Sequence, residues 1–329
     1  MERNYKTILI IINITFALII ISIPTVILLA EYSNYSRIDE SLTYVYSSTT
    51  HPLERQLNLN ADVGKININY NTQPVDYLVK IDVNIEMAGP NLDGKSYLDL
   101  LNIYWENLTS PINFTLEIKS DMIADFSNLH KANININVLL RADVIFDINS
   151  SVLEGAVEVI TPMGINLNNV FTNVINGNIF YDFTSCNILG NVTGIVNNGD
   201  ITLKAYNNQY NQNCTLTFVN EIGYITIDIY QFEEMGANIT GTGITKTGYI
   251  SLIYNDYSPN IGAQFTLYNK TGFGVEGQNT WIGFERDTLP LMAGQFFYSK
   301  DFPTQNNYNF TLFKWDGGDY FWNLYSVPT

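Results

Sequence analysis

Three charged residues, Asp182, Lys204 and Asp228, come nearest in this chain to a spacing that could do chemistry. They recur in a repeated phrase. Aligning the repeats places the two aspartates two units apart on one face, about 10 Å from each other at ordinary strand spacing. Inverting glycosidases hold their two carboxylates about 6.5 to 9.5 Å apart. Because Lys204 falls between the aspartates, the pattern favours a solvated column of alternating charge, and a catalytic pair is the alternative.

Other side chains with reactive or metal-binding groups are sparse. His51 and His130 lack metal-ligand spacing and have no third ligand nearby. Asp316 and Asp319 flank two glycines, a spacing that a turn explains without calcium. No nucleophile elbow, zinc-protease motif or phosphate-binding loop occurs in the sequence. We therefore expect no catalytic residue, no metal site, no cofactor-binding site and no enzymatic activity.

The chain has two cysteines, Cys186 and Cys214. A single disulfide could not act as a framework for a body of this size. The two residues fall at different positions in their repeats, and Cys214 falls among apolar residues, as a buried small hydrophobe does. The sequence leaves both a disulfide and two free thiols open.

A regular series of glycines organises the middle of the chain, at intervals of 22, 22, 24, 25 and 24 residues. The series consists of Gly155, Gly177, Gly199, Gly223, Gly248 and Gly272. In the first five repeats the residues two and four after the glycine are apolar, as Ile201 and Leu203 are. Side chains alternate faces along a strand, so stacked repeats would form continuous buried columns. Glycine permits positive φ and close backbone approach, which predicts a corner at each of these positions.

A repeat of this length predicts stacked units that complete one another's core. We expect an all-β fold, with a parallel β-solenoid of about five coils over residues 151–275. A later strand in each coil gives a second column, aligned once two-residue length differences are allowed. The members of this second column are Val170, Val192, Cys214, Ile239 and Phe265.

The flanking regions are expected to cover the two ends of the solenoid, because open ends invite aggregation. Residues 56–150 alternate apolar and polar residues and predict a β-rich cap region, with a short helix over SYLDLLNIYWENL. Residues 276–329 predict a C-terminal β cap, an aromatic hairpin that turns at Gly317-Gly318. Residues 31–55 are polar, without a sustained period, and indicate a stalk or linker.

Residues 7–30 carry no charge and would span roughly 36 Å as a helix, enough for a bilayer core. The run is longer than the apolar part of a cleaved signal, so it predicts a transmembrane anchor. Arg3 and Lys6 precede it, which places residues 1–6 in the cytoplasm and the body outside the cell. The expected location is the cell membrane, in a single pass.

The formal charge of −16 repels nucleic acid. An outside location suits the Asn-x-Ser/Thr motifs, one of which falls inside the apolar run at Asn13. The other candidate glycosylation sites are Asn34, Asn107, Asn113, Asn149, Asn191, Asn213, Asn238, Asn269 and Asn309. Asn191, Asn213 and Asn238 fall at matching positions in three successive repeats. They predict either a row of glycans or a ladder of Asn and Thr side chains that hydrogen-bond between coils.

The phrases NNGDITLKAY, EIGYITIDIY and KTGYISLIY resemble the prokaryotic putative-adhesin family of β-strand-repeat domains of unknown function, over about residues 151–275. The family offers no catalytic residues to transfer, and its label implies surface display and contact with other molecules. We expect a single-pass, membrane-anchored surface protein with a structural or adhesive, non-catalytic role. Its expected partners are the membrane, through the N-terminal helix, and surface glycans or other surface proteins.

Two alternatives from other functional classes remain. One is a carbohydrate-active β-helix enzyme, which should gather acids and a basic residue in a cleft. The other is an envelope-sensing or accessory subunit of a membrane complex.

Overall fold

The computed structural model describes residues 35–47, 54–90, 92–109, 112–120, 129–258, 261–269, 279–282, 284–289, 294–299, 306–314 and 320–326. Nearly all of these residues lie in strands. The chain divides into two compact units. The smaller comprises residues 1–40, 84–101 and 121–133, and the larger comprises residues 41–83, 102–120 and 134–329. All the repeats belong to the larger unit.

The elements in chain order are β1 (Tyr35–Tyr46), β2 (Glu54–Asn71), β3 (Val79–Pro90), the 3₁₀ turn η1 (Tyr97–Asp99), β4 (Leu101–Thr109), β5 (Ile112–Ser120), β6 (Lys131–Arg141), β7 (Ile145–Thr161), β8 (Asn166–Thr184), β9 (Asn187–Ile188), β10 (Val192–Asn198), β11 (Ile201–Tyr206), β12 (Gln209–Tyr210), β13 (Cys214–Ile222), β14 (Ile225–Gln231), β15 (Ile239–Thr247), β16 (Ile250–Asp256), β17 (Ile261–Asn269), β18 (Asn279–Ile282), β19 (Phe284–Leu289), β20 (Gly294–Ser299), β21 (Asn306–Lys314) and β22 (Tyr320–Ser326).

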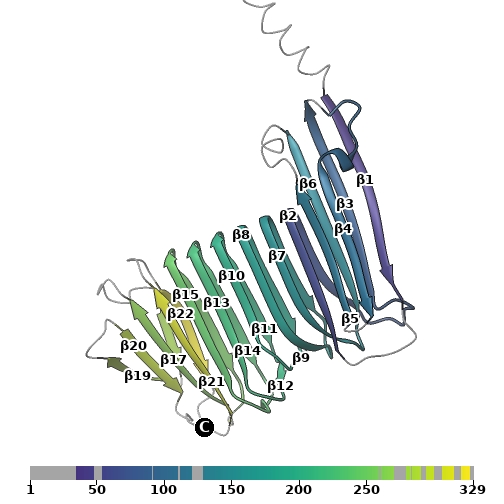
Figure 1. Cartoon of the computed structure of the whole chain (residues 1–329). Coiled ribbons are helices and arrows are strands. Elements are labelled where there is room, and N and C mark those ends of the chain that lie inside the picture. Colours follow the sequence, from purple (N-terminus) through teal and green to yellow (C-terminus); the bar gives the residue numbers. More distant parts are fainter. Residues whose placement is uncertain are drawn as a thin grey trace, which may run out of the picture. The chain divides into compact units, whose positions relative to one another are not determined.

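Two rows of parallel strands build the larger unit (Figure 1). The first row runs in the order β5, β2, β7, β8, β10, β13, β15, β21 and β17. The second row runs in the order β6, β2, β7, β8, β11, β14, β16, β22 and β18. Strands β2, β7 and β8 are 17 to 19 residues long and take part in both rows. Apart from a register shift between Phe146 and Ile148 of β7, each pairing of these parallel strands keeps one register, so equivalent side chains of successive repeats stack.

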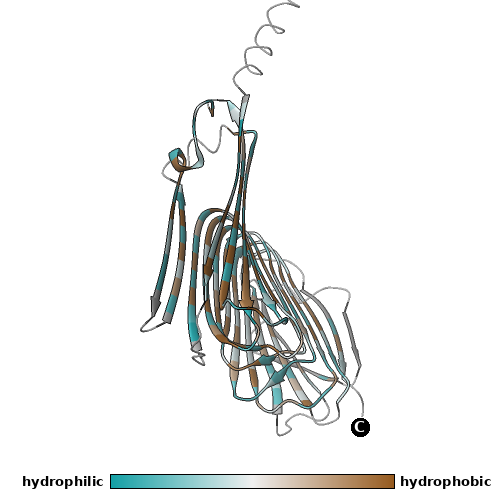
Figure 2. Cartoon of the chain, turned by 90° about the vertical axis from the view of Figure 1, so that its right-hand side faces the viewer, coloured by the Kyte–Doolittle hydropathy of each residue, from teal (hydrophilic) through white to brown (hydrophobic). Residues whose placement is uncertain are grey.

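The apolar columns predicted from the glycines are confirmed. In the second row Ile179, Ile201, Ile225 and Ile250 pair in succession, and each is 1% exposed or less. Figure 2 shows apolar and polar residues alternating along these strands. Complete burial of one such side chain contributes about 1.5 to 3 kcal/mol, so the columns supply the core of the unit.

The corner glycines form a column of their own. Gly155, Gly177, Gly199, Gly223 and Gly248 have φ values between +133° and +145°, which side chains disfavour. A Cβ added to any of them would overlap the carbonyl oxygen of the preceding glycine in the column. Gly64 of β2 pairs with Gly155 and has a φ of +133°. It stands 91 residues earlier in the chain, so the period does not reveal it. Gly272 lies outside the described residues.

The predicted second column is confirmed where Val170 pairs with Val192 and Cys214 pairs with Ile239, but its step from Val192 to Cys214 is wrong by two residues. Val192 pairs with Leu216, not with Cys214, and Leu216 pairs with Gly241. All three stand seven residues before a corner glycine, so the strand before the corner keeps a constant length while the turn ahead of it varies. Phe265 pairs with Phe310 of β21, because β21 lies between β15 and β17.

The predicted helix over residues 96–108 is wrong. Strand β4 begins at Leu101, and the 3₁₀ turn η1 precedes it. Leu98 is 66% exposed, so it belongs to no buried helical stripe. The β-branched and aromatic residues Ile103, Tyr104 and Trp105 favour an extended backbone. The Trp105 ring stacks with that of Phe114, with centroids 6.4 Å apart.

The predicted C-terminal hairpin is also wrong. Strand β21 pairs in parallel with β15, and β22 pairs in parallel with β16, so the two strands continue the two rows as a further repeat. Phe310 fits because Gly241 faces it: a Cβ at Gly241 would overlap the Phe310 ring. Fully buried Tyr308 and Leu312 continue the same inward column. Residues 315–319, including Asp316, Gly317, Gly318 and Asp319, lie outside the described residues.

Part of the predicted stalk is a strand. Residues 35–46 form β1, which pairs with β3. Leu42, Tyr44 and Tyr46 alternate with more exposed neighbours, which is the period of a strand with one covered face. The predicted anchor at residues 7–30 lies outside the described residues, as do Asn34 and His51. Over the described ranges, no helix has the length and apolar character needed to cross a bilayer.

Candidate binding surface

The outward face of the second row brings the charged residues together. Lys204 pairs with Asp182 on one side and with Asp228 on the other. No ion pair within 4 Å joins these three residues, all of which are described. Instead, the Lys204 ammonium lies 5.3 Å from the centroid of the Phe180 ring, and Asp182 accepts a hydrogen bond from the Thr184 hydroxyl at 2.9 Å. The column therefore alternates in charge, but its three members form no salt bridges with one another.

The Asp228 carboxylate has one buried oxygen atom. The residue as a whole is half-buried, and this atom, Oδ1, has no hydrogen-bond partner. Burial raises the pKa of Asp228, and the positive charge of Lys204 only partly opposes that rise. The Oδ1 atom is itself shielded from solvent, so its missing hydrogen bond adds to the cost of keeping Asp228 charged.

Stacked aromatic rings flank the charged column. The rings of Tyr206 and Tyr230 lie 4.9 Å apart and 6° from parallel, and those of Phe232 and Tyr257 lie 4.9 Å apart and 9° from parallel. The Tyr325 ring lies 5.5 Å from that of Tyr257. Phe232 and Tyr257 are 53% and 45% exposed, so the cluster faces solvent.

The aromatic cluster and the acids are contiguous. Burial, with the nearby Tyr230 and Asp228, raises the pKa of Tyr206, and burial with Asp228 and Tyr257 raises the pKa of Tyr230. We call this surface the aromatic–acidic face. It comprises Phe180, Asp182, Lys204, Tyr206, Asp228, Tyr230, Phe232, Tyr257 and Tyr325.

The aromatic residues of this face are not among the sequence predictions, although their spacing from the corner glycines is regular. Tyr206 and Tyr230 both stand seven residues after a corner glycine, and Phe232 and Tyr257 both stand nine residues after one. Tyr206 and Tyr230 end the repeated phrases NNGDITLKAY and EIGYITIDIY, and Phe232 and Tyr257 lie beyond the repeated phrases. A separate stack, Tyr224 on Tyr249 at 3.9 Å, lies immediately after the corner glycines.

Asparagine side chains form ladders between repeats. The backbone N–H of Asn169 donates to Asp147 Oδ1 at 3.2 Å, and that of Asn191 donates to Asn169 Oδ1 at 3.0 Å. The backbone N–H of Thr215 donates to Asn191 Oδ1 at 2.9 Å. The hydrogen-bonded alternative for Asn191 is therefore present. Because these bonds use Oδ1 of each side chain, glycosylation at Nδ2 stays a prediction.

A second ladder joins Asn213, Asn238 and Asn307. The backbone N–H of Asn238 donates to Asn213 Oδ1 at 3.0 Å, and the backbone N–H of Asn307 donates to Asn238 Oδ1 at 2.8 Å. The predicted match between Asn191 and Asn213 does not hold, because Val192 pairs with Leu216. Asn213 and Asn238 do match, since Cys214 pairs with Ile239.

The remaining candidate glycosylation sites are scattered. The Asn149 amide group donates to Asn58 at 3.3 Å, and Asn58 in turn donates to Asn113 at 2.6 Å. Asn107 and Asn309 are exposed. The side chain of Asn269 is outside the described part of the structure.

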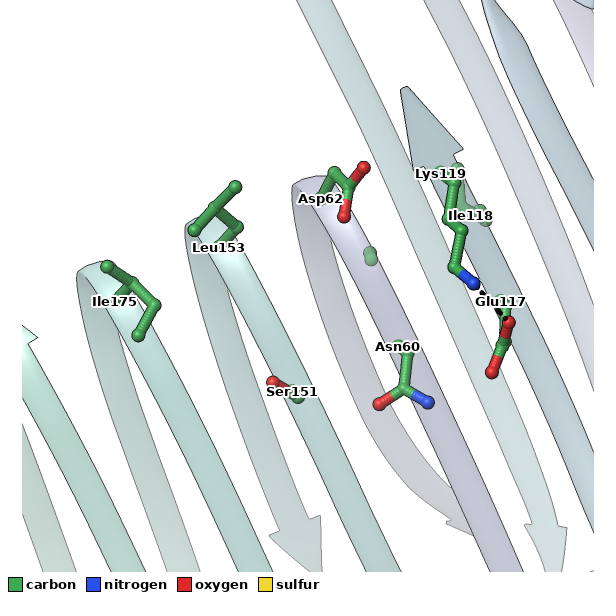
Figure 3. A pocket seen from close by; sticks show the side chains of 9 residues that line it. Asn60, Asp62, Glu117, Ile118, Lys119, Ser151, Leu153 and Ile175 are labelled. Carbon is green, nitrogen blue, oxygen red and sulfur yellow. Dashed lines mark ion pairs between the residues drawn. The ribbon is translucent and has the colours of Figure 1, made fainter. Parts of the chain in front are cut away.

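A shallow pocket of about 260 Å³ lies beside the corner column (Figure 3). Its charged groups already have partners. Asp62 accepts a hydrogen bond from the backbone N–H of Ser120 at 2.8 Å, and Lys119 forms an ion pair with Glu117 at 3.0 Å. Leu153 and Ile175 complete its wall. Among the described residues no three His, Cys, Asp or Glu side chains gather as metal ligands, and His130 is exposed.

Both cysteines are free and buried. Burial raises the pKa of Cys186 to about 11 and that of Cys214 to about 12, which keeps both as thiols at neutral pH. The Cys186 thiol donates to the Asn208 side chain at 3.3 Å. Neither group has the character of a nucleophile.

No family model matches the chain, and no curated protein matches it. Among solved structures, it is similar to a putative cell adhesion protein from Clostridium sporogenes, with 15% identity, coverage of 88% of this chain and 100% of that one, and a TM-score of 0.39. It is also similar to a putative adhesin from Bacteroides fragilis, with 10% identity, coverage of 88% and 97%, and a TM-score of 0.34. At such low identities and TM-scores, these similarities assign neither fold nor function to this chain.

Proposed function

We propose that this chain is a single-pass, membrane-anchored surface protein whose β-solenoid body is an adhesive module that binds neutral glycans through the aromatic–acidic face. The observation that carries the proposal is the contiguity of stacked, solvent-facing rings with charged side chains on the outward face of one row of strands. Aromatic rings provide apolar contact area with a polar edge, and carboxylates and phenols hydrogen-bond to hydroxyl groups.

Charge favours neutral glycans over acidic ones. The chain carries a formal charge of −16, and the face itself has two aspartates and one lysine. A sulfated or uronic-acid polymer would be repelled on approach, since fields of this kind act over about 8 Å at physiological salt. A neutral sugar would meet no such barrier.

Glycan binding can be tested with the full chain in detergent on an array of neutral and acidic glycans. We expect binding to a subset of the neutral glycans, and a loss of at least about tenfold in Tyr230→Ala/Phe232→Ala, because ring contacts of this kind contribute about 1.4 kcal/mol or more. Tyr224→Ala is the matched control, since it removes an exposed stacked ring outside the face. A protein that binds no glycan, or that binds equally after the double substitution, would contradict the proposal.

The topology has its own test. In intact cells, an added protease should cleave the body of the chain. A chain that begins at residue 35 should no longer sediment with the membrane fraction, whereas the full chain should do so until detergent releases it. A body that protease leaves untouched would place it on the other side of the membrane.

A carbohydrate-active enzyme is the second candidate, favoured by one observation: a raised pKa at Asp228 is what a general acid needs. Its partner would be Asp182, about 10 Å away at ordinary strand spacing, which is beyond the separation of about 5 to 5.5 Å in retaining enzymes. A screen for cleavage of the glycans that bind, with Asp228→Asn as the inactive control, separates this candidate from binding alone.

A further inference from the structure

A second group of charged residues lies inside the larger unit, away from the aromatic–acidic face. Arg55, near the start of β2, belongs to the inward column of Leu57 and Leu59 and is only 2% exposed. Its strand neighbour in register is the fully buried Phe146. The alternation of β2 thus directs a guanidinium into the core, where an apolar side chain would ordinarily stand.

Over the part of the chain that the structure describes, no carboxylate forms an ion pair with the Arg55 guanidinium. All three of its nitrogen atoms are buried and without a hydrogen-bond partner. Arginine stays protonated in proteins, and its group carries five N–H donors, so neutralisation by proton loss is not open to it. A charged group that is buried and unpaired is strongly destabilising.

Burial is the main influence on the charge of Arg55, and two neighbouring groups act on it in opposite directions. Burial lowers the pKa of Arg55, Tyr46 opposes that effect, and the nearby positive charge of Arg141 adds to it. Arg141 is itself 8% exposed, and its Nε donates to Asp143 at 2.6 Å. Two guanidinium groups therefore share one region of a strongly acidic protein, with the Asp143 carboxylate already bonded to one of them.

From the burial of Arg55 and its unpaired donors we infer that Arg55 forms a binding site for a small oxyanion. A planar guanidinium holds a carboxylate, sulfate or phosphate through two parallel hydrogen bonds, which would satisfy the donors of Arg55. Because Arg55 is almost completely buried, only a small free anion could reach it, and a charged group attached to a polymer could not. The bound anion would lock the start of β2, and hence the first repeat, into the two rows.

Thermal unfolding of the full chain in detergent tests the inference. After exhaustive dialysis against chloride, phosphate, sulfate and acetate are titrated separately at constant ionic strength. We expect at least one oxyanion to raise the unfolding midpoint by several degrees in a saturable manner, as ligand linkage requires. The three anions distinguish a tetrahedral from a planar preference.

Substitutions of Arg55 and of a control arginine, Arg37, make the test specific. Phosphate and sulfate also stabilise proteins by exclusion from the surface, which does not saturate, so the readout is the saturable part. Arg55→Met should lose that part, whereas Arg37→Met, which removes an exposed and ion-paired arginine, should keep it. If wild type shows no saturable shift, or if Arg55→Met retains it, the inference is overturned. If Arg55→Met does not fold, Arg55→Lys should fold with a weakened saturable shift, and an unchanged shift overturns the inference too.

Discussion

Gly199 carries a requirement that no other residue type can meet. Its φ is +136°, and a Cβ would overlap the Gly177 carbonyl oxygen of the preceding repeat. We expect Gly199→Ala to lower the free energy of unfolding by about 3 kcal/mol or more, because backbone strain and steric overlap act together. Urea denaturation followed by circular dichroism measures the loss.

Gly164 supplies the matched control. It also has a positive φ, +80°, but a Cβ there would meet open space. Gly164→Ala should therefore cost about 1 to 2 kcal/mol, from strain alone. Equal losses in the two variants would show that the stacked corner is not a close contact.

Asp228 gives a prediction about pH. Because its pKa is raised in the folded protein, the desolvation penalty is absent below the pKa of the unfolded chain, grows between the two pKa values, and is complete above the folded one. Asp228→Asn should thus raise the midpoint of thermal unfolding at pH 7, with the gain vanishing as the pH falls to about 3 to 4. Lys204→Met should act in the opposite direction at pH 7, because it removes the charge that lowers the pKa. A gain from Asp228→Asn that is independent of pH would refute this account.

At the scale of the elements, the asparagine ladders hold the turns ahead of the strands in register. Asn191 accepts both the Thr215 amide, at 2.9 Å, and the Thr215 hydroxyl, at 3.0 Å. We expect Asn191→Ala to lose about 1 kcal/mol of unfolding free energy and Asn191→Asp to lose little, since aspartate keeps the acceptor. Chemical denaturation of protein made in bacteria, without glycans, provides the measurement. A loss in Asn191→Asp as large as that in Asn191→Ala would mean that the side-chain amide, not its oxygen, is what the fold uses.

Across the whole molecule, the sequence predicts whatever stands at a constant distance from the corner glycines. The inward columns of the second row meet that condition, and so do Asp182, Lys204 and Asp228. The column through Val192 was counted forward from the preceding glycine, across a turn of variable length, and therefore missed Leu216. Counting back from the following glycine gives the observed register.

Two larger features depend on contacts that skip along the chain. Gly64 joins the corner column across 91 residues, and Ile239 pairs with Tyr308 across 69. A parallel ladder requires matching positions in space and no particular spacing in sequence, so an insertion hides a repeat from any periodic search. Arg55 was missed for a different reason: nothing in its neighbourhood in the sequence shows that its side chain lacks a partner.

The place of β21 and β22 in the two rows leads to a prediction about the intact fold. If these strands were a detachable hairpin lid, the rest of the body would keep its structure without them. In the structure β21 lies between β15 and β17, and β22 between β16 and β18, so a chain that ends at residue 305 leaves strand edges unpaired on both sides. It also uncovers Phe265 and Tyr254, whose rings pack 6.0 Å from Phe310 and 5.5 Å from Tyr308, respectively.

We expect this truncated chain to aggregate, and a chain that ends at residue 326 to elute like the full chain in size-exclusion chromatography in detergent. A truncated chain that elutes as one sharp peak and unfolds cooperatively would show instead that the core is complete before β21.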